Sequence, residues 1–84
     1  MKLKNKILIV DDEKEIRELL EIYLQNEGYN VIKASDGKEA LDIFNNEEID
    51  LLVLDVMMPN MDGLEVCKRI RESKNVPILM LSAK

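Results

Sequence analysis

Short apolar runs alternate along this chain with longer segments in which apolar residues recur at helical spacing. The runs predict four strands, at residues 6–10, 31–34, 51–55 and 78–82. Three of them are almost entirely apolar, as expected for strands of a parallel sheet that is covered on both faces. The run at 31–34 is shorter and contains Lys33, so we expect it at an edge of the sheet.

The segments between these runs predict three helices, at about residues 13–27, 37–46 and 63–73. Their apolar residues lie three and four positions apart, which places them on one face of each helix. We expect that face to be buried, with Gly28 ending the first helix. The face consists of Ile16, Leu19, Leu20, Tyr23 and Leu24 in the first helix, Ala40, Leu41 and Phe44 in the second, and Leu64, Cys67 and Ile70 in the third.

Each predicted helix begins with the pattern Asp-x-x-Glu, which is typical of a capping box. In this motif the first side chain accepts a hydrogen bond from an amide of the first turn, and the glutamate reaches back to the capping residue. The pattern occurs at Asp12 and Glu15, at Asp36 and Glu39, and at Asp62 and Glu65.

The alternation of strands and helices predicts an α/β fold in one domain, a doubly wound parallel sheet. Right-handed crossovers with the first strand central give the spatial order 31–34, 6–10, 51–55, 78–82. In open sheets of this kind, ligands bind beyond the carboxyl ends of the strands, where the strand order reverses. We therefore expect a binding site between the ends of strands 6–10 and 51–55.

Acidic residues follow both of these strands. Asp11, Asp12 and Glu13 come directly after the first run, and Asp55 ends the third. Carboxylate oxygens gathered in one crevice suit a hard divalent cation, and without a cation their mutual repulsion is costly. Asp12 alone is also explained as a helix cap, so both interpretations remain open for it. Asp55 is followed by an apolar segment and then Pro59, and it faces no predicted helix start.

Composition excludes several classes of function. The chain has 84 residues, 17 Asp and Glu against 12 Lys and Arg, and a net charge of −5, which argues against binding of nucleic acid. The single cysteine, Cys67, forms no internal disulfide and is interpreted as a core residue of a protein in a reducing compartment. Histidine, the commonest general base, is absent. The segment before Asp11 is too short for a secretory or membrane-spanning sequence, so we expect a cytoplasmic location without membrane contact.

Three segments carry a resemblance to a known family: ILIVDDE at 7–13, LVLDVMMPNMDG at 52–63 and PILMLSA at 77–83. Together they resemble, over the whole chain, the receiver domain of bacterial two-component response regulators. The resemblance implies a flavodoxin-like fold and a phosphorelay function. In that function the domain is a phosphoacceptor that regulates an output domain, commonly one for transcription, rather than an enzyme with an external substrate.

The resemblance also implies a role for each site residue. Asp55 matches the phosphoacceptor, whose carboxylate attacks a phosphoryl group donated by a sensor histidine kinase. Asp12 matches the direct ligand of Mg²⁺ or Mn²⁺, and Asp11 the acid that holds a metal-bound water. The metal set also includes Asp55 and the backbone carbonyl of Met57. Ser82 matches the hydroxyl residue that turns toward the phosphoryl group.

The chain departs from the family pattern at its carboxyl end. It stops two residues beyond Ser82, so we expect this receiver domain to lack the family's fifth strand, two further helices and an output domain. The family's lysine near the end of that strand is missing too, and Lys84 is not in its position. We therefore interpret residues 1–84 as a receiver domain truncated after its fourth strand. Metal binding should survive, phosphorylation and output should be weakened, and the apolar strand edge at 78–81 should promote self-association.

Three other functions are alternatives to this one. A non-signalling fragment would fold or self-associate without phosphotransfer, and acetyl phosphate with Mg²⁺ would leave Asp55 unlabelled. A hydrolase like the haloacid dehalogenases requires a second acid two residues after the strand-end aspartate, where this chain has Met57. A nucleotide-binding domain requires a glycine-rich turn after the first strand, and none is present. The cognate kinase, the stimulus and the regulated genes are not specified by these residues.

Overall fold

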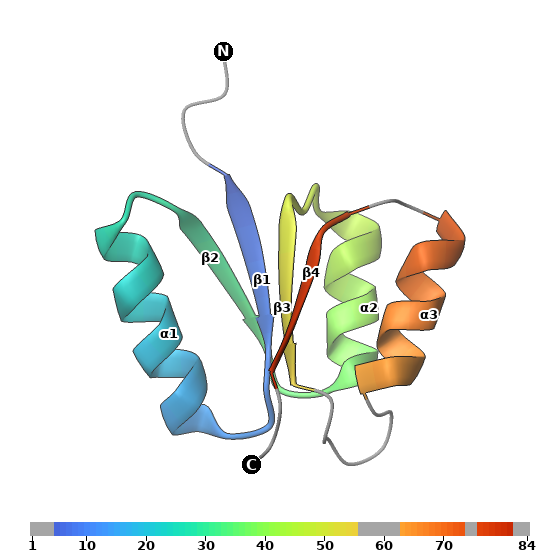
Figure 1. Cartoon of the computed structure of the whole chain (residues 1–84), viewed down its shortest axis with the longest axis horizontal. Coiled ribbons are helices and arrows are strands. Elements are labelled where there is room, and N and C mark those ends of the chain that lie inside the picture. The colour runs from blue at the N-terminus through green and yellow to red at the C-terminus, as the bar shows by residue number, and fades with distance from the viewer. Residues whose placement is uncertain (1–4, 56–62, 74–75, 82–84) are drawn as a thin grey trace.

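A computed structural model of the chain describes residues 5–55, 63–73 and 76–81, and Figure 1 shows their arrangement. Strands and helices alternate along the chain, as the sequence predicts. Among the described residues no helix is long and apolar enough to span a membrane. The elements are β1 (Lys6–Val10), α1 (Lys14–Asn26), β2 (Asn30–Ala34), α2 (Gly37–Asn46), β3 (Leu51–Asp55), α3 (Gly63–Ser73) and β4 (Ile78–Leu81).

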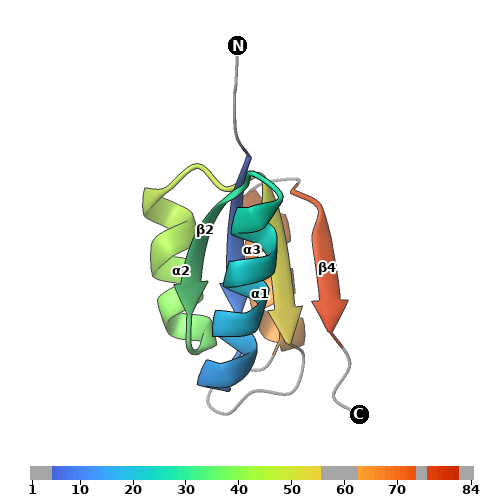
Figure 2. The same cartoon turned by 90° about the vertical axis from the view of Figure 1, so that its left-hand side faces the viewer.

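The strands form one parallel sheet in the order β2-β1-β3-β4, which confirms the predicted order and the edge position of β2. Helix α1 covers one face of the sheet, and α2 and α3 cover the other (Figures 1 and 2). In the register of the sheet, Val10 of β1 lies beside Ala34 of β2 and Leu54 of β3. The carboxyl ends of these three strands therefore lie level with one another, at the edge where the sequence predicts the site.

The main core lies between the sheet and the helices α2 and α3. Alternate residues of β1 and β3 point into it, because successive side chains of a strand face opposite sides of the sheet. The intervening apolar residues of these strands face α1 and form a smaller cluster beneath it. The buried members of this cluster are Ile7, Ile9 and Val53. Burial on both faces explains why these strands are almost entirely apolar. The main cluster contains Leu8, Val10, Leu52 and Leu54 from β1 and β3, and Ala40, Phe44, Val66 and Ile70 from the helices.

Part of the predicted burial of α1 is wrong. Leu20 and Leu24 pack against the cluster beneath the helix, as expected, but Leu19 is 64% exposed and Tyr23 is 63% exposed. Within the described part of the chain, α1 is the single helix on this face of a four-stranded sheet. The flank of α1 that carries Leu19 and Tyr23 therefore has no second helix beside it within that part.

The buried face of α3 also differs from the prediction. Ile70 is buried and Cys67 partly buried, but Leu64 is 63% exposed and Val66 is fully buried in its place. Two residues along a helix correspond to a rotation of about 200°. Leu64 therefore lies almost opposite Val66, and the buried stripe is centred on Val66 and Ile70.

The three predicted capping boxes have different outcomes. Asp36 caps α2, since its Oδ1 accepts a hydrogen bond from the amide of Glu39 at 2.9 Å. The Glu39 carboxylate accepts hydrogen bonds from the amide and the hydroxyl of Ser35, the residue before Asp36, at 2.8 and 3.0 Å. The prediction for Asp12 is wrong, because α1 begins after Glu13, whose side chain makes no capping bond. Asp62 lies outside the described residues.

The Asp36 cap supplies a first test of the fold. Replacing Asp36 with alanine leaves an amide of the first turn of α2 without its acceptor, and should lower the free energy of unfolding by about 1 kcal/mol. Urea denaturation followed by circular dichroism measures this loss. Asp42→Ala is the matched control, because Asp42 is exposed in the interior of the same helix. Equal unfolding midpoints for the two variants would contradict the capping role.

Candidate functional site

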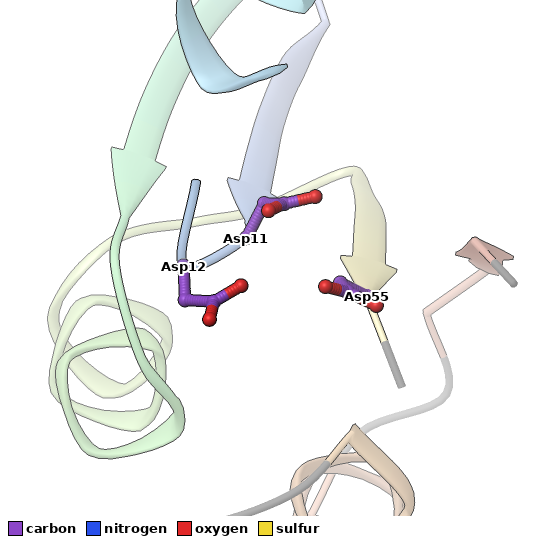
Figure 3. Close-up of side chains that lie close together, drawn as sticks. All are labelled: Asp11, Asp12 and Asp55. Atoms are coloured by element: carbon purple, nitrogen blue, oxygen red, sulfur yellow. The ribbon is translucent and has the colours of Figure 1, made fainter. Parts of the chain in front are cut away.

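Three carboxylates meet at the carboxyl edge of the sheet. Asp11 and Asp12 follow β1, and Asp55 is the last residue of β3. One carboxylate oxygen from each lies within 4.8 Å of the other two (Figure 3). Asp11 and Asp55 are buried, at 5% and 9% exposure, whereas Asp12 is exposed to solvent. The structure therefore confirms the convergence that the sequence predicts for these three residues.

Hydrogen bonds to its amide, its carboxylate and its carbonyl oxygen position Asp11 after the end of β1. Its amide donates to the carbonyl of Ala34 at 3.2 Å, which continues the sheet one residue beyond β1. Its Oδ1 accepts a bond from the amide of Glu13 at 2.8 Å. Its carbonyl oxygen accepts a bond from Nη1 of Arg17 at 2.7 Å. The turn between β1 and α1 is thus held at its first residue, which has a carboxylate oxygen within 4.8 Å of one from Asp55.

The electrostatics of the site favour a cation. Burial raises the pKa of Asp11 above its ordinary value, and the charges of Asp55 and Asp12 raise it further. The amide of Glu13 and the guanidinium of Arg17 act in the opposite direction but do not cancel the increase. Ionisation of Asp11 is therefore less favourable in the folded protein without a cation than it is for an aspartate in water. A cation among the three carboxylates would offset this cost.

The donor set fits a hard divalent cation. Its donors are carboxylate oxygens, which Mg²⁺ prefers, and the chain has no histidine to favour a transition metal. Two oxygens bound to one Mg²⁺ at about 2.1 Å lie at most about 4.2 Å apart. The observed limit of 4.8 Å requires only a small contraction. The exposure of Asp12 leaves the outer side open to water, which Mg²⁺ retains in most protein sites.

Two residues named for the site lie outside the described residues, namely Met57 and Ser82. Their predicted roles stay predictions. Arg17 is a site neighbour that the sequence reasoning did not identify. The sequence signal for such a neighbour was a basic residue early in the helix that follows the acidic pair. Helix periodicity does not show, however, which group the end of a long side chain contacts.

Comparison with known proteins identifies the family. The sequence profile of the response regulator receiver domain matches residues 7–84. The chain belongs to this family. This receiver domain is 55% identical over 83 residues to the alkaline phosphatase synthesis transcriptional regulatory protein PhoP of Bacillus subtilis. The match covers 98% of this chain and 35% of that protein. The chain spans about a third of the length of the curated relatives that it matches.

Solved structures agree with this assignment. The receiver chain is similar to the response regulator TrrA of Thermotoga maritima in complex with Mg²⁺-BeF, with a TM-score of 0.90, 47% identity, and coverage of 95% of this chain and 70% of that one. It is also similar to a chain in the complex of the histidine kinase ThkA with TrrA, with a TM-score of 0.89, 48% identity, and coverage of 94% and 69%. The predicted family and the partial receiver fold are confirmed.

The raised pKa of Asp11 predicts how stability depends on pH. The folded state holds this proton more tightly than the unfolded state, so the contribution is fully present below about pH 4 and is lost as the pH rises through the folded pKa. Without metal, Asp11→Asn should therefore be more stable than the wild type at neutral pH and no more stable at low pH. Thermal unfolding in EDTA across this range measures the difference. A difference that does not change with pH would contradict the prediction.

Proposed function

We propose that this receiver domain acts in a phosphorelay by accepting a phosphoryl group on Asp55 from a sensor histidine kinase. Asp11, Asp12 and Asp55 would hold Mg²⁺, or Mn²⁺ in its place. In the longer protein the domain would control an output domain that regulates transcription. The observation that carries the proposal is the position of Asp55, at the end of a buried strand with its oxygen within 4.8 Å of two further carboxylates.

The proposed chemistry is a direct displacement at phosphorus. An Asp55 carboxylate oxygen attacks the phosphorus atom, a new O–P bond forms, and the P–N bond of the donor phosphohistidine breaks. The imidazole leaves with the electron pair of that bond and is protonated as needed from solvent. When bound, the cation supplies neutralisation of the negative charge on the phosphoryl oxygens. Asp55 lies at the carboxyl edge of the sheet beside the solvent-exposed Asp12, which supports access by a donor from that side.

Similar proteins support the same function. TrrA has been solved with Mg²⁺-BeF and with the histidine kinase ThkA, and PhoP is described as a transcriptional regulatory protein. By analogy, we assign the metal and the kinase partner to this chain as parts of the proposal. The backbone carbonyl of Met57 would complete the metal set, and the hydroxyl of Ser82 would bind the new phosphoryl group.

Phosphorylation by a small donor tests the proposal directly. The purified chain is incubated with acetyl phosphate and Mg²⁺, Mn²⁺ or EDTA, and its intact mass is measured. We expect the mass of one added phosphoryl group with either metal and no addition with EDTA. A chain that is folded by circular dichroism and binds Mg²⁺, yet gains no phosphoryl group, would contradict phosphotransfer. That result would favour the non-signalling fragment.

We also propose that the 84-residue polypeptide self-associates through β4. Among the described strands β4 pairs with β3 alone, and its Leu79 and Met80 are 55% and 41% exposed. An apolar edge strand presents unpaired backbone groups to a second chain. Light scattering should show a mean mass above that of the monomer, and Leu79→Lys should reduce it. A monodisperse monomer at high concentration would refute self-association.

A further inference from the structure

Arg17 connects helix α1 to the turn that carries two of the three carboxylates. Its own amide donates to the carbonyl of Glu13 at 3.1 Å, in the first turn of the helix. Its Nη1 reaches back to the carbonyl oxygen of Asp11 at 2.7 Å. The helix itself is anchored to the sheet by Leu20 and Leu24, which pack on the cluster beneath it. The guanidinium therefore holds the turn in place relative to a helix that is packed on the sheet.

The bonded carbonyl belongs to the peptide unit that joins Asp11 to Asp12. Because a peptide unit is planar, the direction of this carbonyl also sets the direction of the Asp12 amide and limits where the Asp12 side chain can point. Among the described residues, no hydrogen bond or ion pair holds the Asp12 carboxylate. Its direction toward Asp55 (Figure 3) therefore depends on the backbone of this turn.

We propose that Arg17 is a positioning residue for the metal centre. Its guanidinium fixes the peptide between Asp11 and Asp12, so that the Asp12 carboxylate faces Asp55 before a cation arrives. This inference rests on the proposed function, because the cation site is the one assigned there. An arginine suits the task, since its planar, permanently charged group makes a directed bond to a carbonyl oxygen.

Because Arg17 is positively charged, the direction of the change in Mg²⁺ affinity when it is replaced tests the proposal. A positive group beside a cation site repels the cation, so at a pH where Asp11 is ionised its removal should, on electrostatics alone, tighten Mg²⁺ binding. Loss of positioning should weaken the same binding, since removing a group that orients a metal ligand typically costs about 10-fold or more in affinity. The two effects have opposite directions. Weaker binding by a variant that has lost a positive charge would thus report positioning.

Lys14 supplies a matched control. It lies in the first turn of the same helix, its side chain is 75% exposed, and its ion pair is a long contact of 3.9 Å with Glu18. It lines the same surface cavity of about 250 Å³ as Arg17, but it makes no bond to the turn within the described structure. Removing its charge therefore changes the electrostatics of this surface and leaves the peptide between Asp11 and Asp12 in place.

The experiment is calorimetric titration of Mg²⁺ into the wild-type chain and into Arg17→Met, Arg17→Lys and Lys14→Met, with circular dichroism to verify folding. Methionine keeps an unbranched stem and a good helix propensity. We expect Arg17→Met to bind Mg²⁺ about 10-fold more weakly, Arg17→Lys to recover part of the affinity, and Lys14→Met to bind as the wild type or slightly more tightly. In metal-free NMR spectra, the amide resonance of Asp12 should shift in Arg17→Met and not in Lys14→Met.

The possible outcomes separate this inference from the proposed function. Absence of Mg²⁺ binding by the folded wild-type chain would overturn the metal centre and the role of Arg17 with it. Normal binding by the wild type, together with equal or tighter binding by Arg17→Met, would overturn the role of Arg17 alone. If Arg17→Met does not fold, Arg17→Lys decides the matter: weaker binding supports positioning, and wild-type affinity refutes it.

Discussion

Asp55→Asn is expected to abolish incorporation of the phosphoryl group from acetyl phosphate in the presence of Mg²⁺. Asparagine keeps the size and shape of the side chain but replaces the anionic oxygen with a neutral amide, which is a poor nucleophile. The substitution also removes one of the three carboxylates that converge at the sheet edge. Intact-mass measurement should therefore show no added phosphoryl group under conditions in which the wild type is labelled.

The same substitution should leave the fold intact. The charge of Asp55 raises the pKa of Asp11, so its removal relieves a repulsion in the metal-free protein. We therefore expect Asp55→Asn to unfold at the same temperature as the wild type or a higher one in EDTA, which separates loss of chemistry from loss of structure. Asp42→Asn, at an exposed position of α2, is the control and should be labelled normally. Labelling of folded Asp55→Asn would show that the acceptor is another residue.

Much of the fold was predictable because its signals are local. The bounds predicted for β1 and β3 match those observed, since an acid marks the end of each apolar run: Asp11 follows β1, and Asp55 is the last residue of β3. The strand order follows from the handedness of crossovers, and it brings Asp55 beside Asp11 without any knowledge of side-chain positions. The convergence of the carboxylates was therefore available from strand ends and topology alone.

The remaining features depend on contacts that a sequence pattern does not contain. Periodicity shows that α1 is amphipathic, but the number of neighbouring helices decides whether Leu19 and Tyr23 are covered. The capping pattern at Asp12 fails because the helix begins one residue later, after Glu13. The bond from Arg17 to the turn depends on the direction of one carbonyl group. Backbone direction at a turn is set by tertiary contacts on both sides of it.

Leu52→Ala is expected to remove a large part of the stability of this chain. Leu52 of β3 is fully buried, beside Leu8 of β1 and Ile78 of β4. Such a truncation typically costs about 2–5 kcal/mol, through lost burial and the cavity that remains. A domain of 84 residues has a total stability of roughly 4–13 kcal/mol. Urea denaturation should therefore show a much lower midpoint, and a substantial unfolded fraction without denaturant if the wild type lies near the lower limit.

Leu79→Ala provides the comparison within the same sheet. Leu79 is 55% exposed on β4, so its truncation should cost less than about 1 kcal/mol. Equal midpoints for Leu52→Ala and Leu79→Ala would contradict the assigned core. Labelling of Asp55 should fall in proportion to the unfolded fraction of Leu52→Ala, and Mg²⁺ should restore part of it, because a ligand of the folded state shifts the folding equilibrium. Phosphorylation thus depends on the stability of β3, because its apolar residues are part of the core and its last residue is the proposed phosphoacceptor.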